Sequence, residues 1–85
     1  MTRVEYCPAA RRLRLRGHAG AGERGSDPVC AALSILVYAL LDAGAAGEVR
    51  TGMAELTLPE DAALALRGFR LLAENFPQNV EFKEV

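Results

Sequence analysis

The sequence predicts an α+β domain, a two-layer sheet with two helices in the order ββ-α-ββ-α-β. The chain has 85 residues, which is enough for one hydrophobic core and too few for two. Its hydrophobic share of 51% is typical of a folded chain. Short segments with a two-residue period alternate with two longer segments whose apolar residues recur every three or four positions. We therefore treat residues 1–85 as a single domain.

The first two strands are expected to form a hairpin. Residues 2–7 suit a short strand, and Pro8 breaks it. Residues 11–18 alternate strictly between leucine on one face and arginine on the other, which is typical of a half-buried strand. The loop that follows, residues 19–26, contains three glycines and few side chains that could pack, so we expect it to be mobile. The alternating residues are Leu13 and Leu15 on one face, and Arg12, Arg14 and Arg16 on the other.

The first helix has a strong start signal at Asp27 and Pro28. An aspartate can accept the free backbone N–H groups of the first turn, and proline suits the first helical position. We expect the helix to run to about Ala43, because Gly44 is a natural C-terminal stop. It is apolar almost all round, so it is either central to the core or half of a subunit interface.

A second hairpin is predicted from residues 48–51 and 53–58, with its turn near Gly52. Residues 79–85 close the chain as a last strand, with Val80 and Phe82 facing the same way.

The second helix is predicted to lie between two prolines. Pro59 begins it, with Glu60 and Asp61 placed against the positive end of the helix dipole, and Pro77 ends it. The expected buried face consists of Ala62, Ala65, Leu66, Phe69, Leu72, Ala73 and Phe76.

Charge and cysteine content exclude several classes of protein. The net charge is −1, with six arginines among residues 1–24, so the domain as a whole is not basic and we expect no direct nucleic acid partner. The longest nearly apolar run, residues 28–41, is too short to cross a bilayer, so no membrane role is expected. Two cysteines do not make a disulfide framework, and free thiols are typical of the reducing cytoplasm.

His18, the only histidine of the chain, and Cys30 are the candidate catalytic pair. If Asp27 is the N-cap, Cys30 is the third residue of the helix, where free N–H groups and the dipole stabilise a thiolate. Cys30 would attack a carbonyl, and His18 would take its proton and return it to the leaving amine. The backbone N–H groups of Cys30 and Ala31 would receive the oxyanion. A cysteine near a helix start is more often a small buried hydrophobe, so spacing alone leaves both interpretations open.

The residues around this pair are similar to the signature of the ribosomal-processing cysteine proteases, the Prp family. That signature joins a Gly-His to an Asp-x-x-Cys-Ala-x-x-Ser at the interval seen here, and the predicted order of strands and helices also fits. The chain departs from it at Pro28, where the family commonly has an aliphatic residue, and in shorter turns near Pro8 and Gly52. The matching positions are Gly17, His18, Asp27, Cys30, Ala31 and Ser34.

The resemblance implies an endopeptidase that removes the N-terminal extension of a large-subunit ribosomal protein by cutting after an aromatic residue. It implies a homodimer, the ribosomal-protein precursor as substrate, and no cofactor or metal. It assigns Cys30 as the nucleophile, His18 as the general base, and Gly17, Asp27 and Ser34 as supporting residues.

Three supporting residues each have a structural and a functional interpretation. Asp27 either caps the helix only, which we favour, or also orients His18. Ser34 either hydrogen-bonds the carbonyl of Cys30 or shapes the site. Gly17 either ends the strand or lets the substrate backbone approach, and the resemblance favours the second.

The loop, the arginine row and the remaining thiol also carry alternatives. Substrate is expected to displace loop 19–26. The arginine row is expected to be the solvated face of an edge strand, although it could face RNA or an acidic peptide. A non-catalytic ribosome-associated or protein-binding module using that row is the alternative function. A redox role lacks a Cys-x-x-Cys motif, and a metal site built from Cys7, His18 and Cys30 lacks paired-ligand spacing.

Overall fold

The computed structural model describes residues 1–23 and 25–85, and Arg24 of the predicted loop lies outside the described residues. The predicted element order ββ-α-ββ-α-β is confirmed. No helix in the described part of the chain is long and apolar enough to span a membrane. The elements are β1 (Thr2–Cys7), β2 (Arg12–Arg16), α1 (Pro28–Asp42), β3 (Ala46–Arg50), β4 (Met53–Thr57), α2 (Ala63–Asn75) and β5 (Val80–Glu84).

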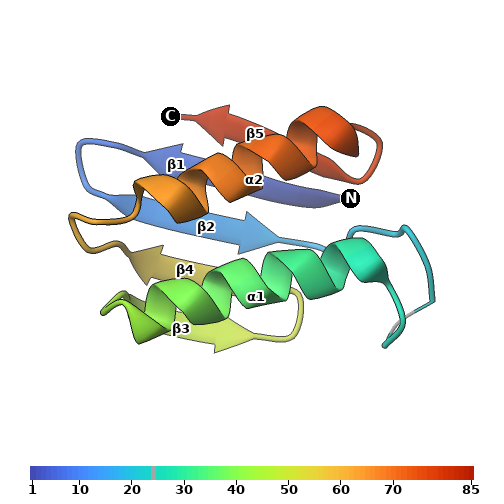
Figure 1. Ribbon diagram of the computed structural model, residues 1–85, viewed down its shortest axis with the longest axis horizontal. Coiled ribbons are helices and arrows are strands. Elements are labelled where there is room, and N and C mark those ends of the chain that lie inside the picture. Colours follow the sequence, from blue (N-terminus) through green and yellow to red (C-terminus); the bar gives the residue numbers. More distant parts are fainter. Residues whose placement is uncertain (24) are drawn as a thin grey trace.

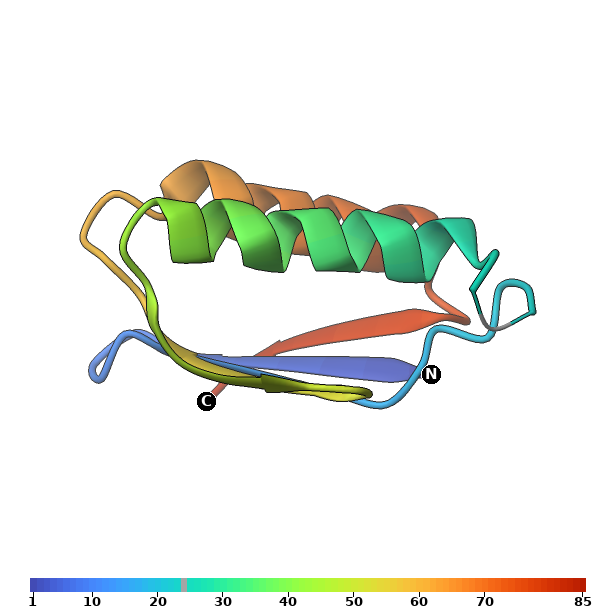
Figure 2. The same cartoon turned by 90° about the horizontal axis from the view of Figure 1, so that it is seen from below.

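The five strands form one mixed sheet in the order β3-β4-β2-β1-β5. Strand β5 runs parallel to β1, and the other neighbours are antiparallel. Both helices cover the same face of the sheet, side by side and in opposite directions (Figures 1 and 2). The hydrophobic core therefore lies between the helix layer and this single face, and the other face is left open.

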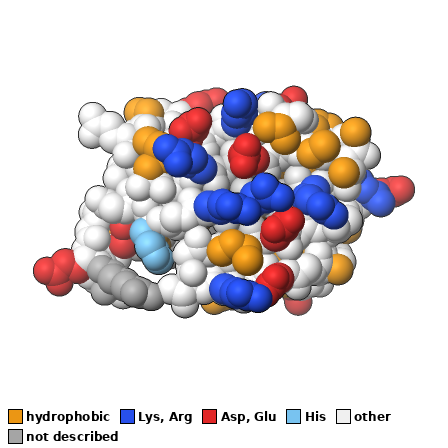
Figure 3. Space-filling view, turned by 180° about the vertical axis from the view of Figure 1, so that it is seen from behind, with side chains coloured by type: hydrophobic (Ala, Val, Ile, Leu, Met, Phe, Trp, Pro, Cys, Tyr) orange, Lys and Arg blue, Asp and Glu red, His pale blue; other side chains and the backbone are white. Residues whose placement is uncertain are grey.

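The prediction that the arginine row lies on an edge strand is wrong, because β2 is the central strand. It pairs with β1 on one side and with β4 on the other. Its leucines, Leu13 and Leu15, are buried under the helices, while its arginines project from the uncovered face among acidic side chains (Figure 3). Arg14 Nη2 lies 3.3 Å from Glu55 Oε1 on the neighbouring strand, which partly neutralises the row.

Helix α1 is buried on one face only, although its sequence is apolar almost all round. One face is buried against the sheet through Val29, Leu33, Val37 and Leu40, whereas Ile35 on the opposite face is 63% exposed. The helix therefore supplies both the core and an exposed apolar surface.

Helix α2 begins later than predicted, at Ala63 rather than at Pro59, and its first turn contains no acidic residue. The reason lies in Leu58, which is buried and donates its N–H to the carbonyl of Arg11 at 2.7 Å. This bond extends the sheet beyond β4, so the next residues must carry the chain up to the helix layer before the helix can start.

The buried face of α2 is shorter than predicted. Phe69 is 0% exposed and forms its centre, whereas Phe76 is 43% exposed and lies outside the core. Phe76 is the C-cap residue, so the chain has already left the helical path there.

The ends of several strands meet at one end of the sheet, beside the N-terminus of α1. The N–H of Gly17, just after β2, donates to the carbonyl of Gly52 in the β3–β4 turn at 2.9 Å. The N–H of Thr2, at the start of β1, donates to the carbonyl of Asn79, just before β5, at 2.9 Å. Residues from distant parts of the sequence are thereby brought together at this end.

Candidate active site

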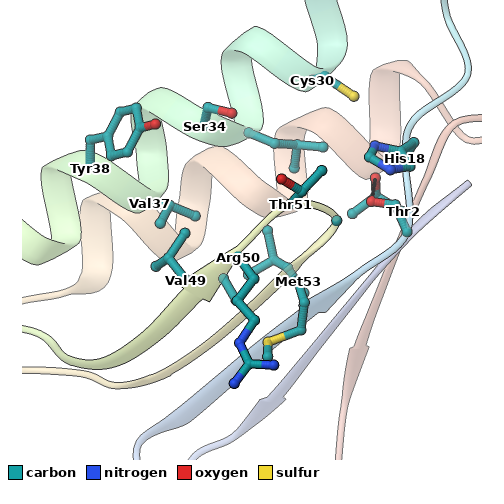
Figure 4. A pocket seen from close by; sticks show the side chains of 15 residues that line it. Thr2, His18, Cys30, Ser34, Val37, Tyr38, Val49, Arg50, Thr51 and Met53 are labelled. Atoms are coloured by element: carbon teal, nitrogen blue, oxygen red, sulfur yellow. Dashed lines mark hydrogen bonds between the residues drawn. The ribbon is translucent and has the colours of Figure 1, made fainter. Parts of the chain in front are cut away.

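A cavity of about 530 Å³ opens where α1 passes over the turn between β3 and β4 (Figure 4). His18, Cys30 and Ser34 all line it, so the structure brings three of the predicted site residues to one surface. Its other walls combine polar side chains, among them Thr2, Arg50 and Thr51, with an apolar set: Leu15, Leu33, Val37, Val49, Met53 and Ala54.

Cys30 lies in the first turn of α1, as the sequence predicts, and it is half-buried. Asp27 is the N-cap residue, and its Oδ1 accepts the N–H groups of Val29 at 2.9 Å and Cys30 at 3.0 Å. The sulfur itself accepts the backbone N–H of Ala19 at 3.3 Å. A backbone donor is therefore aimed at the sulfur, which lies beside the N-terminus of the helix.

The carboxylate of Asp27 also anchors the glycine-rich loop. Its second oxygen, Oδ2, accepts the N–H of Ala21 at 2.8 Å. The N–H of Cys30, with those of Ala21 and Val29, holds the pKa of Asp27 below its ordinary value, although burial opposes the effect. Within residues 1–23 and 25–85 no hydrogen bond joins Asp27 to His18, which agrees with the cap interpretation.

His18 follows β2 and presents an exposed imidazole to the cavity. The ring lies against Gly52, where an added Cβ would stand 3.1 Å from Nε2. Gly52 has φ +73°, a conformation that favours glycine. The sulfur of Cys30 projects from α1 on the side of the cavity where His18 lies (Figure 4). The described residues show no direct hydrogen bond between the pair, and such bonds often tighten only when substrate binds.

Gly17 and Ser34 each have a local structural explanation. Gly17 has φ +94°, and the carbonyl of Met1 occupies the space where its Cβ would be, so the backbone alone requires glycine there. Ser34 is exposed on the cavity wall, and its hydroxyl has no hydrogen bond to the carbonyl of Cys30 in the described structure. Its geometry agrees with the interpretation that it shapes the site.

The two backbone groups predicted to receive the oxyanion are engaged by Asp27. The N–H of Cys30 donates to its side chain, and the N–H of Ala31 donates to its carbonyl, both at 3.0 Å. The hydrogen bonds that cap the helix therefore already use the N–H groups of Cys30 and Ala31.

A family model described as cysteine protease Prp matches residues 1–81. The chain belongs to the cysteine protease Prp family. It is therefore a peptide-bond hydrolase of the cysteine class. Among curated proteins no match is found.

Solved structures share this Prp fold. The S. aureus ribosomal processing protease Prp with a covalently linked product peptide superposes with a TM-score of 0.80 at 19% identity, covering 100% of both chains. The same protease with a substrate peptide gives 0.70 at 18% identity, again over 100% of both chains. The protein SMU.848 from Streptococcus mutans gives 0.69 at 28% identity, over 99% of this chain and 91% of that one. These likenesses establish the two-helix, five-strand architecture.

Sequence reasoning missed three residues of this Prp site: Thr2, Gly52 and Asn79. The sequence indicates only that Gly52 is a turn residue, because no pattern predicts that this turn contacts the imidazole of His18. Thr2 lines the cavity, and its hydroxyl lies 3.4 Å from the carbonyl of Gly17. Asn79 donates its side-chain N–H to the carbonyl of Ala19 at 2.9 Å across 60 positions of sequence, for which no local signal exists.

The second thiol lies away from the Prp cavity. Cys7 is on β1 opposite Arg12 and lines a separate hollow with Arg12 and Arg14, on the face that the helices leave open. The part of the chain that the structure describes contains no group of three His, Cys, Asp or Glu side chains able to hold a metal ion.

Proposed function

We propose that this protein is an endopeptidase that removes the N-terminal extension from the precursor of a large-subunit ribosomal protein, in the cytoplasm. The observation that carries the proposal is the shared cavity of Cys30 and His18 in a chain of the cysteine protease Prp family. The two S. aureus structures, described as a ribosomal processing protease bound to substrate and product peptides, support the substrate class.

The chemistry follows from the positions of the two side chains. His18 takes the thiol proton of Cys30, and the Sγ thiolate attacks the carbonyl carbon, so a C–S bond forms and negative charge develops on the carbonyl oxygen. The C–N bond then breaks, His18 gives its proton to the leaving amine, and the acyl group remains on Cys30 as a thioester. Water attacks the thioester while His18 takes a proton from it, the C–S bond then breaks, His18 returns the proton to Sγ, and the acid product leaves.

The walls of the cavity support cleavage next to an aromatic residue. Val37 of α1 faces Val49 of the second hairpin across the cavity (Figure 4), and Leu33 and Met53 also line it. An aromatic side chain placed between them exchanges water for apolar contact, at about 25 cal/mol per Å² buried. We therefore assign these side chains to the residue on the N-terminal side of the cut.

The loop after Ala19 is proposed to move aside for the substrate. Residues 20–23 are exposed, and only the bond from Ala21 to Asp27 attaches their described backbone to the helix. Hydrogen exchange of the Ala21 N–H should be faster when a peptide binds, because displacement of the loop breaks its bond to Asp27. Equal exchange with and without peptide would refute the gating.

We further propose that the protein acts as a homodimer through the outer surface of its helix pair. Ile35 on α1 is 63% exposed and Leu64 on α2 is 86% exposed, and apolar surface of this kind commonly marks an interface. A domain of 85 residues also gains from the additional burial. Light scattering should give a dimer for the wild type and a monomer for Ile35→Glu, with Val85→Glu as an exposed control. A monomeric wild type would refute the dimer.

The test of the function is a mass-spectrometric cleavage assay on the extended ribosomal protein of the same organism. Wild type should cut once near the N-terminus, Cys30→Ser should not cut, and Cys7→Ser should cut as wild type does. An uncut substrate with an otherwise folded wild type would overturn the proposed substrate. Loss of ribosome association on neutralising Arg12, Arg14 and Arg16 would then favour a binding role for the uncovered sheet face.

A further inference from the structure

The segment that carries His18 is held in place by hydrogen bonds from three different elements. The N–H of Gly17 is bound to the β3–β4 turn, and the N–H of Ala19 is bound to the sulfur of Cys30 at 3.3 Å. The carbonyl of Ala19 accepts the side-chain N–H of Asn79 at 2.9 Å. Ala19 is 1% exposed, so the start of the predicted loop is part of the core.

Asn79 is itself rigidly attached to the framework. Its backbone N–H donates to the carbonyl of Phe76 at the end of α2, and its carbonyl accepts the N–H of Thr2 at the start of β1, both at 2.9 Å. Its side chain therefore extends from a fixed point in the fold to the peptide group that follows Ala19.

The N–H of Ala19 is a backbone donor that already contacts the sulfur of Cys30. Those of Cys30 and Ala31 already donate to Asp27. In the tetrahedral intermediate the oxyanion is bonded to the carbon that Sγ has attacked, so a donor that touches the sulfur is within reach of that oxygen as well. As the C–S bond forms, the sulfur loses its negative charge and the oxygen gains it.

We propose that Asn79 is a positioning residue for catalysis, which holds Ala19 so that its N–H donates first to the thiolate of Cys30 and then to the oxyanion. The inference rests on the proposed peptidase function. When the intermediate collapses, the electron pair on oxygen restores the carbonyl, the C–N bond breaks, and the proton held by His18 goes to the amine. The amide hydrogen of Ala19 stays on its nitrogen throughout.

The experiment compares Asn79→Asp with Asn75→Asp. The first change keeps the shape of the side chain but turns an oxygen toward the carbonyl of Ala19, where a donor stood. Asn75 makes the same kind of bond, from Nδ2 to the carbonyl of Leu71 at 2.8 Å, on the exposed surface of α2. It therefore controls for the added charge and for loss of a side-chain bond.

We expect Asn79→Asp to lower kcat about tenfold to hundredfold with KM within about twofold, since misplaced catalytic groups cost rate rather than binding. Asn75→Asp should keep the wild-type kcat. Alkylation of Cys30 by iodoacetamide at neutral pH, which needs no substrate, should slow in Asn79→Asp only. Wild-type kcat and alkylation in a folded Asn79→Asp would overturn the proposal.

If Asn79→Asp does not fold, a measurement on the wild type tests whether the Ala19 N–H donates to the oxyanion. In ¹⁵N-labelled protein the Ala19 amide should shift more than those of Cys30 and Ala31 when a peptide aldehyde forms a hemithioacetal on Cys30. An unshifted Ala19 amide would overturn the proposal. If the wild type cuts no peptide, the peptidase function fails, whereas alkylation of Cys30 still reports on Asn79.

Discussion

Replacing Gly52 with alanine tests whether the β3–β4 turn holds the catalytic imidazole. The new methyl carbon would lie 3.1 Å from His18 Nε2 and 3.4 Å from Cε1. Ordinary contacts between heavy atoms begin near about 3.5 Å, so the ring must move by roughly half an ångström. A misplacement of about 1 Å can cost a factor of about a hundred, so we expect kcat to fall about tenfold.

The same substitution also strains the backbone, and this effect must be separated from the first. A non-glycine residue in the left-handed region costs about 1–2 kcal/mol, and φ at Gly52 is +73°. Gly44→Ala is the matched control, because Gly44 has φ +108° and nothing lies within 4 Å of the added carbon. A domain of this size has about 4–13 kcal/mol of stability, so both variants should remain folded.

Urea unfolding and steady-state kinetics are measured on both variants. Both should lose a similar free energy of unfolding, while only Gly52→Ala should lose kcat. If the two variants have the same kcat at comparable stability, the contact between Gly52 and His18 has no part in catalysis and the reasoning is refuted.

Three further predictions concern the helix cap, the two thiols and the core. The pKa of Asp27 is lowered in the folded state, so its stabilisation is present above about pH 4 and is lost as the pH falls below that value. Asp27→Asn should therefore flatten the acid side of the stability curve, and an unchanged curve between pH 5 and pH 2 would contradict this. Cys30 should react with iodoacetamide about tenfold faster than Cys7 near pH 7, because its sulfur lies in the first turn of α1 and accepts the backbone N–H of Ala19. Equal rates by mass spectrometry would count against activation. Phe69→Ala should cost about 3–5 kcal/mol in urea unfolding, since Phe69 is 0% exposed. The exposed Phe76→Ala should cost about 1 kcal/mol or less, and similar losses would show that the core is placed wrongly.

Local patterns were sufficient to predict the type and the order of the helices and strands. The alternation of Leu13 and Leu15 with arginine predicted β2, and Asp27 with Pro28 predicted the first residues of α1, because both signals act within one turn or one strand. The signature residues likewise predicted His18 and Cys30 as a pair, and the structure places both at one cavity.

Local patterns failed where pairing with another strand decides the position or the length of an element. The alternation in β2 says that one face is buried, but it cannot say whether another strand lies on each side, so the central strand was taken for an edge. Pro59 and the two acidic residues after it suit a helix start, but the bond from Leu58 to Arg11 keeps that segment in the sheet for longer.

By itself, the sequence determined the order of the elements, the buried faces of the strands and the capped start of α1, and it pointed to Cys30 and His18 as the candidate pair. Only the tertiary structure decided which backbone N–H reaches the sulfur, that Gly52 supports the imidazole, and that Asn79 holds Ala19 from the far end of the chain. The physical reason is the separation in sequence over which each interaction acts. Capping and periodicity act over a few residues, whereas these contacts form where β1, β2, β5 and the β3–β4 turn converge at one end of the sheet.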